Sequence, residues 1–166
     1  MAHPISDCVG DPRQGGVVMQ RMEASLLAPE AYEAVAELDR RVSEASIDGA
    51  LYELIKIRAS QINGCAYCID LHIRVARKRG ETDERIHALN AWRKSPLLSE
   101  RERAALGLTE AVTLLSETRV PDDVWVEAEG TFGERELANL LMATVAINAW
   151  NRIAVKTRMV PRHASQ

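Results

Sequence analysis

Residues 64–72 of the chain read Gly64-Cys65-Ala66-Tyr67-Cys68-Ile69-Asp70-Leu71-His72. This segment holds two of the three cysteines and one of the four histidines in the 166 residues. If a helix begins near residue 66, both cysteines and His72 lie at positions i, i+3 and i+7, within about 60° of one another on one face. Cysteines three residues apart in such a turn have Cα atoms about 5–6 Å apart, a distance that a disulfide tolerates. The segment therefore predicts a reversible disulfide beside a histidine.

The start of this helix also favours reactive sulfur. Unpaired N–H groups and the positive end of the helix dipole stabilise a thiolate over a thiol. His72 follows Cys68 by four residues, so it can hydrogen-bond that sulfur or relay its proton. Upstream, Glu53 lies within the apolar run 51–57, where we expect a largely buried helix. A carboxylate in that helix, if turned toward the dithiol, can act as a general base.

Composition and charge set the class of protein. With 46% hydrophobic and 27% charged residues, the chain is long enough for one domain with a sizeable core. The net charge of −3 and the scattered basic residues argue against a nucleic-acid partner. The polar first residues do not resemble a signal peptide, and the longest apolar run, 137–150, is too short to cross a bilayer. We expect a cytoplasmic protein with no membrane segment, in which a Cys-x-x-Cys motif is catalytic or metal-binding.

The pattern of apolar residues, caps and breakers predicts an all-α fold. We expect an irregular arm over residues 1–24 and one helical domain of about seven helices over 25–166. The expected helices are 29–46, 50–62, 65–79, 82–91, a fifth that begins after a capping box at Ser99 and Glu102, 122–130 and 134–157. Asn63 and Gly64 allow a tight turn that brings Glu53 toward the cysteines.

The last expected helix is apolar on nearly every side, so we predict that it is buried all round and that subunits assemble through it. Asn148 and Asn151 interrupt its apolar pattern. We expect a buried hydrogen-bond network or a subunit contact at these two residues, with a direct supporting role in the site as the alternative.

Two other uses of the motif cysteines remain open. Structural zinc needs a second pair of ligands, and the candidates Cys8, His3, His87 and His163 are not paired in the sequence. The motif cysteines can also be packed core residues without chemistry, because free cysteine buries well. We expect Cys8, in the N-terminal arm, to be a free thiol.

The sequence resembles the AhpD-like alkylhydroperoxidase branch of the carboxymuconolactone decarboxylase family from about residue 29 to residue 158. The resemblance rests on Glu53 followed after eleven residues by Cys65-x-x-Cys68-x-x-x-His72, on Gln61-Ile62-Asn63-Gly64 in front of the cysteines, and on Ile147-Asn148-Ala149-Trp150-Asn151-Arg152 near the end. It implies a helical subunit assembled as a trimer or hexamer, with a dithiol that reduces organic hydroperoxides. It also implies no bound cofactor, and recycling of the dithiol by a lipoyl-type dithiol or another thiol-donor protein.

The resemblance further implies a role for each site residue. Cys68 is then the more buried nucleophile, Cys65 resolves it as a disulfide, and Glu53 and His72 manage protons. Characterised AhpD proteins have a further relay histidine between the cysteines, at the position of Tyr67 in this chain. A tyrosine hydroxyl can still hydrogen-bond at the mouth of a site. The decarboxylases of the family lack the cysteine pair, so the resemblance favours a peroxidase.

The leading hypothesis is therefore an alkylhydroperoxidase-type oxidoreductase that works through its dithiol. The alternatives are a non-enzymatic redox sensor, a zinc-binding helical oligomer, or a general disulfide reductase that uses the same residues. Peroxide turnover and metal content separate these hypotheses.

Overall fold

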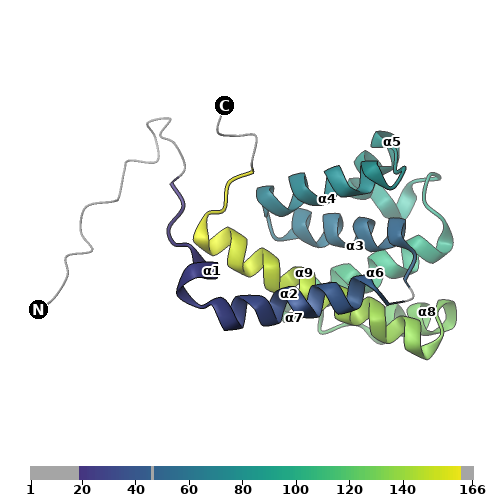
Figure 1. Ribbon diagram of the computed structural model, residues 1–166. Coiled ribbons are helices and arrows are strands. Elements are labelled where there is room, and N and C mark those ends of the chain that lie inside the picture. Colours follow the sequence, from purple (N-terminus) through teal and green to yellow (C-terminus); the bar gives the residue numbers. More distant parts are fainter. Residues whose placement is uncertain (1–18, 46, 162–166) are drawn as a thin grey trace, which may run out of the picture.

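The computed structural model describes residues 19–45 and 47–161, and every regular element among them is a helix (Figure 1). In chain order the elements are α1 (Ala24–Leu27), α2 (Pro29–Ser43), α3 (Gly49–Ile62), α4 (Ala66–Lys78), α5 (Asp83–Ala88), the 3-10 helix η1 (Leu89–Lys94), α6 (Glu100–Thr113), α7 (Leu115–Thr118), α8 (Asp122–Thr131) and α9 (Glu134–Thr157). None of these helices is long and apolar enough to cross a membrane. The all-α prediction is confirmed, while most of the arm predicted for residues 1–24 lies outside the described residues.

Helix α3 lies at the centre of the fold and contacts α4, α6 and α9 (Figure 1). Asp48 caps its N-terminus by accepting hydrogen bonds from the backbone N–H groups of Ala50 and Leu51, both at 3.0 Å. Nine of the 14 residues of α3 are buried, as the apolar run around Glu53 predicted. Two of the buried side chains, Glu53 and Lys56, can carry charge, so they need partners from neighbouring helices.

A tight turn leads from α3 into α4. Gly64 has φ = +65°, a conformation that glycine adopts without the strain that a side chain brings. The N–H of Cys65 donates to the carbonyl of Ser60 at 2.9 Å and so closes the turn. The turn predicted at Asn63 and Gly64 is confirmed, and it places the first turn of α4 against the end of α3.

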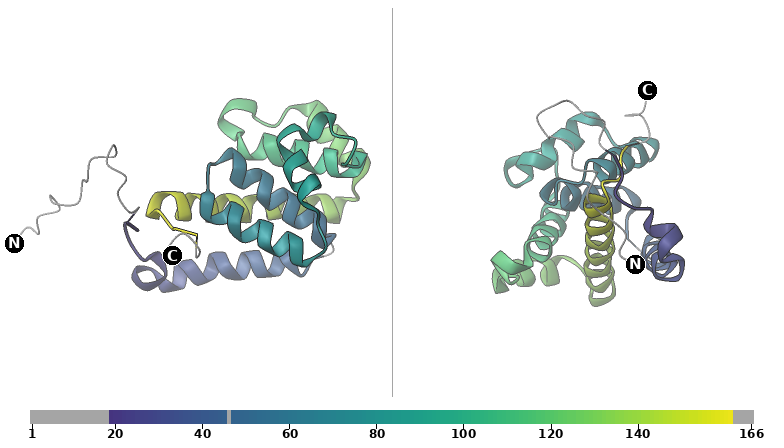
Figure 2. Two further views of the ribbon diagram at one scale, coloured as in Figure 1. Left: turned by 90° about the horizontal axis from the view of Figure 1, so that it is seen from above. Right: turned by 90° about the vertical axis from the view of Figure 1, so that its left-hand side faces the viewer.

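Helices α2 and α9 pack along each other (left view of Figure 2). Within a single subunit α9 is not buried all round. Ala138, Met142 and Val145 lie on one exposed stripe of α9, and the latter two residues are 39% and 40% exposed. Because these residues are small or apolar, the sequence pattern does not distinguish them from core positions.

Several boundaries differ from the sequence prediction. The expected helix 82–91 is two elements: α5, capped by Thr82 as predicted, and the 3-10 helix η1, in which Ala91 has non-helical angles of φ −129° and ψ 31°. Helix α6 ends at Thr113 because Leu114 leaves the helical region, and the short α7 follows. Helix α2 ends at Ser43, and the short α1 precedes it, so nine α-helices and one 3-10 helix stand in the described part where seven helices were expected.

We predict that Asp48→Ala lowers the free energy of unfolding by about 1 kcal/mol, because two N–H groups at the start of α3 lose their acceptor. Urea denaturation followed by circular dichroism measures this change. The matched control is Asp123→Ala in the exposed first turn of α8, where we expect a change within about 0.5 kcal/mol. Equal losses in the two variants would mean that the Asp48 cap contributes nothing specific.

Candidate active site

Cys65 and Cys68 form a disulfide at the start of α4, with their Cα atoms 5.4 Å apart. Cys65 is the N-cap residue of the helix, and its Sγ accepts a hydrogen bond from the backbone N–H of Cys68 at 3.3 Å. Both side chains are buried, at 2% and 3% exposure. The N-terminus of α4 therefore holds the sulfur pair in a setting that stabilises a thiolate when the bond is reduced.

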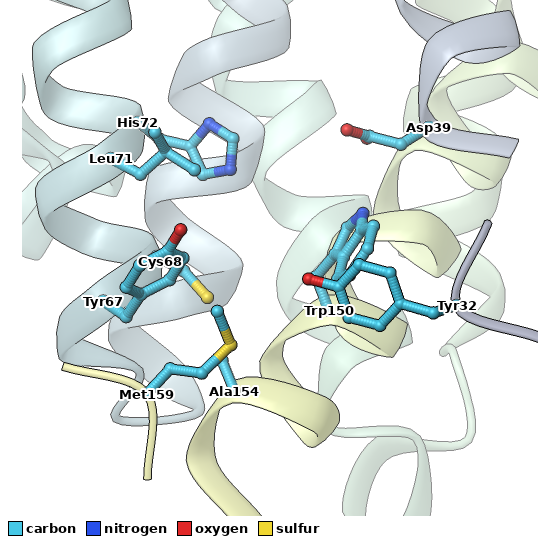
Figure 3. A pocket seen from close by; sticks show the side chains of 9 residues that line it. All are labelled: Tyr32, Asp39, Tyr67, Cys68, Leu71, His72, Trp150, Ala154 and Met159. Atoms are coloured by element: carbon cyan, nitrogen blue, oxygen red, sulfur yellow. The ribbon is translucent and has the colours of Figure 1, made fainter. Parts of the chain in front are cut away.

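A cavity of about 220 Å³ lies beside the disulfide. Its wall is formed by residues of α2, of α4, of the second half of α9 and of the segment that follows α9, namely Tyr32, Asp39, Tyr67, Cys68, Leu71, His72, Trp150, Ala154 and Met159. Figure 3 shows the sulfur of Cys68 and the ring of His72 on one side of the cavity, with Trp150 and Tyr32 on the other. The last two rings meet edge to face, with their centroids 4.9 Å apart. An apolar, aromatic wall thus faces a sulfur and an imidazole.

The two cysteines are equally buried, but they differ in whether they border the cavity. Cys68 lines the cavity and Cys65 does not. The expectation that Cys68 is the more buried of the two is not met, because both cysteines are almost fully buried. Both cysteines pack in one cluster with Ala59 and Ile147, and Cys68 in addition borders the cavity.

Glu53 and His72 form a buried pair between α3 and α4. The Nδ1 atom of His72 lies 2.9 Å from Oε2 of Glu53, and the two residues are 8% and 2% exposed. Burial lowers the pKa of His72 below its ordinary value, and the hydrogen bond to Glu53 only partly opposes this effect. The imidazole is therefore neutral at neutral pH. When Nδ1 donates its proton to the carboxylate, Nε2 is left as the proton acceptor.

Glu53 pairs with His72, whose ring lines the cavity. Glu53 itself does not line the cavity, and its ionic partners are His72 and, at 3.8 Å, the Nη2 atom of Arg79. The sequence prediction that Glu53 acts directly on a thiol is therefore replaced by an indirect arrangement, in which the carboxylate orients the imidazole that faces the cavity.

A second buried polar cluster adjoins this pair and was missed in the sequence. Lys56 is 3% exposed, and its Nζ lies 2.8 Å from Oδ1 of Asp39, a residue that lines the cavity. The hydroxyl of Tyr52 donates to the same carboxylate at 2.9 Å. Burial, together with the negative charge of Asp39, raises the pKa of Tyr52 above its ordinary value. The signal available in the sequence was Lys56 itself, a charge inside the apolar run 51–57.

Asn148 and Asn151 belong to a buried hydrogen-bond network, as one of the two sequence interpretations held. The Nδ2 atom of Asn63 donates to Oδ1 of Asn148 at 3.0 Å and to Oδ1 of Asn151 at 2.9 Å. Asn148 in turn donates to Oγ1 of Thr113, and Asn151 donates to Oγ of Ser60, each at 3.0 Å. The network ties α9 to the residue just before Gly64, and so fixes the turn that carries the cysteines.

Of the remaining candidates, only Tyr67 lies at the cavity among the residues that the structure describes. Tyr67 occupies the position at which characterised AhpD proteins have a relay histidine, and its side chain lines the cavity. His87 is exposed on α5, whereas Cys8, His3 and His163 lie outside the described residues. Among residues 19–45 and 47–161, no three His, Cys, Asp or Glu side chains are grouped so that they could hold a metal ion.

Comparison with known proteins places this geometry in a family. Residues 29–111 match the carboxymuconolactone decarboxylase family. The chain is 40% identical over 136 residues to the Bacillus subtilis protein YdfG, an alignment that covers 82% of this chain and 92% of YdfG. It is 39% identical to the crystal structure of an Agrobacterium tumefaciens protein of unknown function, described there as a candidate antioxidant defence protein AhpD. That superposition has a TM-score of 0.84 and covers 86% of this chain and 98% of the other.

A more distant structure shares only the fold. The debrominase Bmp8 is 18% identical, has a TM-score of 0.71, and is matched over 83% of this chain and 74% of its own. At this identity the likeness shows the fold and not the reaction. The family match over half of the chain, together with the close relatives that cover most of it, shows that this protein belongs to the carboxymuconolactone decarboxylase family and has an AhpD-like fold.

Proposed function

We propose that the protein is a thiol-dependent peroxidase that reduces organic hydroperoxides through a Cys65–Cys68 dithiol/disulfide cycle. The observation that carries the proposal is the cavity, because one wall holds the sulfur of Cys68 together with the imidazole of His72, and the other holds aromatic rings. A peroxide group can therefore meet a sulfur and a proton carrier while its organic part packs against Trp150 and Tyr32.

In the first step, His72 Nε2 accepts the thiol proton of Cys68, and the resulting thiolate attacks one oxygen of the peroxide bond. The O–O bond breaks, the sulfur becomes a sulfenic acid, and the second oxygen leaves as an alkoxide. The protonated His72 returns the proton to this alkoxide, which leaves as an alcohol. Glu53 stabilises the imidazolium through its 2.9 Å contact with Nδ1.

In the second step, the thiol of Cys65 attacks the sulfenic sulfur of Cys68, so that the disulfide forms and water is released. Two thiols and one hydroperoxide thus yield one disulfide, one alcohol and one water. The Cα separation of 5.4 Å supports this step, because the disulfide closes within one helical turn.

An external dithiol of the lipoyl type, or another thiol-donor protein, then restores the pair. One donor thiol attacks the sulfur of Cys68 through the cavity and forms a mixed disulfide, and Cys65 leaves as a thiolate that the N–H of Cys68 stabilises. The second donor thiol then attacks the donor's own sulfur, so that Cys68 leaves as a thiolate and the donor leaves as a disulfide. The cycle needs a reducing compartment, so we place the protein in the cytoplasm.

Access to the sulfur separates this proposal from its alternatives. A pure redox sensor needs oxidation but no cavity for an organic group, whereas a cavity with aromatic rings in its wall lies beside Cys68. The cavity therefore favours a small organic substrate. The fold alone does not decide the reaction, since a debrominase shares it.

We predict that the pre-reduced protein reduces cumene or tert-butyl hydroperoxide with a burst of one alcohol per subunit, and that Cys68→Ser abolishes the burst. Cys65→Ser should keep the first turnover and accumulate a sulfenic acid at Cys68, because the resolving thiol is missing. Stopped-flow measurement with dimedone trapping and peptide mass spectrometry follows both events, and Cys8→Ser is the control. A burst that survives in Cys68→Ser would contradict this assignment of the nucleophile.

We predict that His72→Gln lowers the rate of peroxide reduction by about 10²–10⁴-fold, the usual contribution of a positioned base. Glu53→Gln keeps the shape but removes the negative charge beside Nδ1, and we expect a loss of about 10²-fold. The double variant should lose much less than the product of the two, because both residues serve one relay. Single-turnover kinetics measures the rates, with the exposed Glu127→Gln on α8 as the control. If the rate loss of the double variant equals the product of the two single losses, Glu53 and His72 act independently and the shared relay is wrong.

We further propose that the protein is a homo-oligomer, a trimer or a hexamer. The exposed stripe of Ala138, Met142 and Val145 on α9 supports this, because a contiguous apolar stripe on a surface helix is typical of a subunit contact.

We predict that Val145→Glu or Met142→Glu lowers the mass of the assembly measured by light scattering, because a charge enters an apolar contact. The control is Leu97→Glu, which places the same charge at a 45% exposed apolar residue in the loop after η1. A monomeric mass for the unmodified protein at micromolar concentration would end the proposal.

A further inference from the structure

Arg79 connects the solvent to the buried pair of Glu53 and His72. It caps the C-terminus of α4, and its side chain is 42% exposed. Its Nη1 atom donates to the carbonyl of Gly49 at 3.1 Å, and Nη2 lies 3.8 Å from Oε1 of Glu53. The oxygen that Glu53 does not use for His72 therefore faces a permanent positive charge.

Gly49 supplies the space for this guanidinium. A Cβ atom at residue 49 would lie 2.5 Å from Nη1 of Arg79, so any other residue would push the guanidinium away. The carbonyl of the same glycine accepts the hydrogen bond that orients Arg79. The first residue of α3 and the C-cap of α4 together hold the guanidinium against Glu53.

The other charged groups near the pair are already engaged. Helix α3 brings Tyr52 and Lys56, and α2 brings Tyr32 and Asp39, of which Lys56, Tyr52 and Asp39 bond to one another. Helix α4 adds Tyr67 and Cys68, and the residues of α9 that line the cavity, Trp150 and Ala154, carry no titratable group. Among the described residues, Arg79 is thus the cation that faces the free oxygen of Glu53.

We propose that Arg79 is a positioning residue that fixes the proton of His72 on Nδ1. Its guanidinium faces Oε1 of Glu53, so Oε2 is the oxygen that accepts the proton of Nδ1, and Nε2 is left as the base for Cys68. If Glu53 carries a proton instead, it donates to Nδ1, the ring proton sits on Nε2, and His72 can no longer accept the thiol proton. This inference deepens the proposed function, because it concerns the same dithiol.

The test measures how readily the thiol of Cys68 ionises, without any peroxide. The full-length reduced protein is alkylated with iodoacetamide over a pH series, and peptide mass spectrometry quantifies Cys68 separately from the other cysteines. In Arg79→Gln the midpoint of the Cys68 profile should move to higher pH by about 0.5–1 unit, since both the cation and the ordered base are lost. Arg79→Lys keeps the charge and should restore most of the shift.

Two further variants separate charge from shape. Gly49→Ala leaves Arg79 in the chain but displaces its guanidinium, so it should move the midpoint in the same direction, even if Arg79→Gln fails to fold. Arg77→Gln is the matched control, because this arginine lies in the last turn of α4 and pairs with Asp83 on the surface. We expect its profile to coincide with that of the unmodified protein.

The proposal is overturned if the Arg79→Gln profile coincides with that of Arg77→Gln, or if Arg79→Lys behaves like Arg79→Gln. Peroxide turnover is assayed separately in the unmodified protein. A shifted alkylation profile without peroxide turnover would leave the role of Arg79 standing while ending the proposed function. Peroxide turnover together with unshifted alkylation profiles would support the proposed function and end the proposed role of Arg79.

Discussion

The burial of one carboxylate constrains much of this structure. Glu53 lies inside the central helix α3 at 2% exposure, and a charge in that position needs partners at both oxygens. One partner is His72 on α4, and the other is Arg79 at the end of the same helix. The antiparallel pairing of α3 and α4, their tight turn at Gly64 and the absence of a side chain at Gly49 all serve this arrangement.

The opposite end of the same helix pair is held by neutral groups. Asn63 bonds to two asparagines of α9, and these continue to Thr113 of α6 and Ser60 of α3. Buried amides of this kind tolerate little displacement, because an unpaired polar atom in the core is costly. Helix α9 therefore acts as the wall of the cavity through Trp150 and as the brace of the cysteine turn through its asparagines.

Much of this architecture was predictable from the sequence because its signals are local. The spacing of Cys65, Cys68 and His72, the Gly64 turn and the Ser99 capping box each depend on residues a few positions apart. The misses concern long-range partners. Nothing near Lys56 in the sequence identifies Asp39 on another helix as its partner, and nothing in α9 marks Met142 as exposed rather than buried. Such facts follow from how helices pack, which an apolar pattern alone does not determine.

Cys65 combines two duties that are usually separate, since it caps a helix and belongs to a redox pair. In the oxidised state its sulfur accepts the N–H of Cys68 as a neutral atom, whereas in the reduced state a thiolate accepts it with a full charge and therefore more strongly. The start of α4 is thus capped best when the pair is reduced. Helix capping energy therefore contributes to the driving force for reduction, whereas the Cα separation of 5.4 Å contributes to closure of the disulfide.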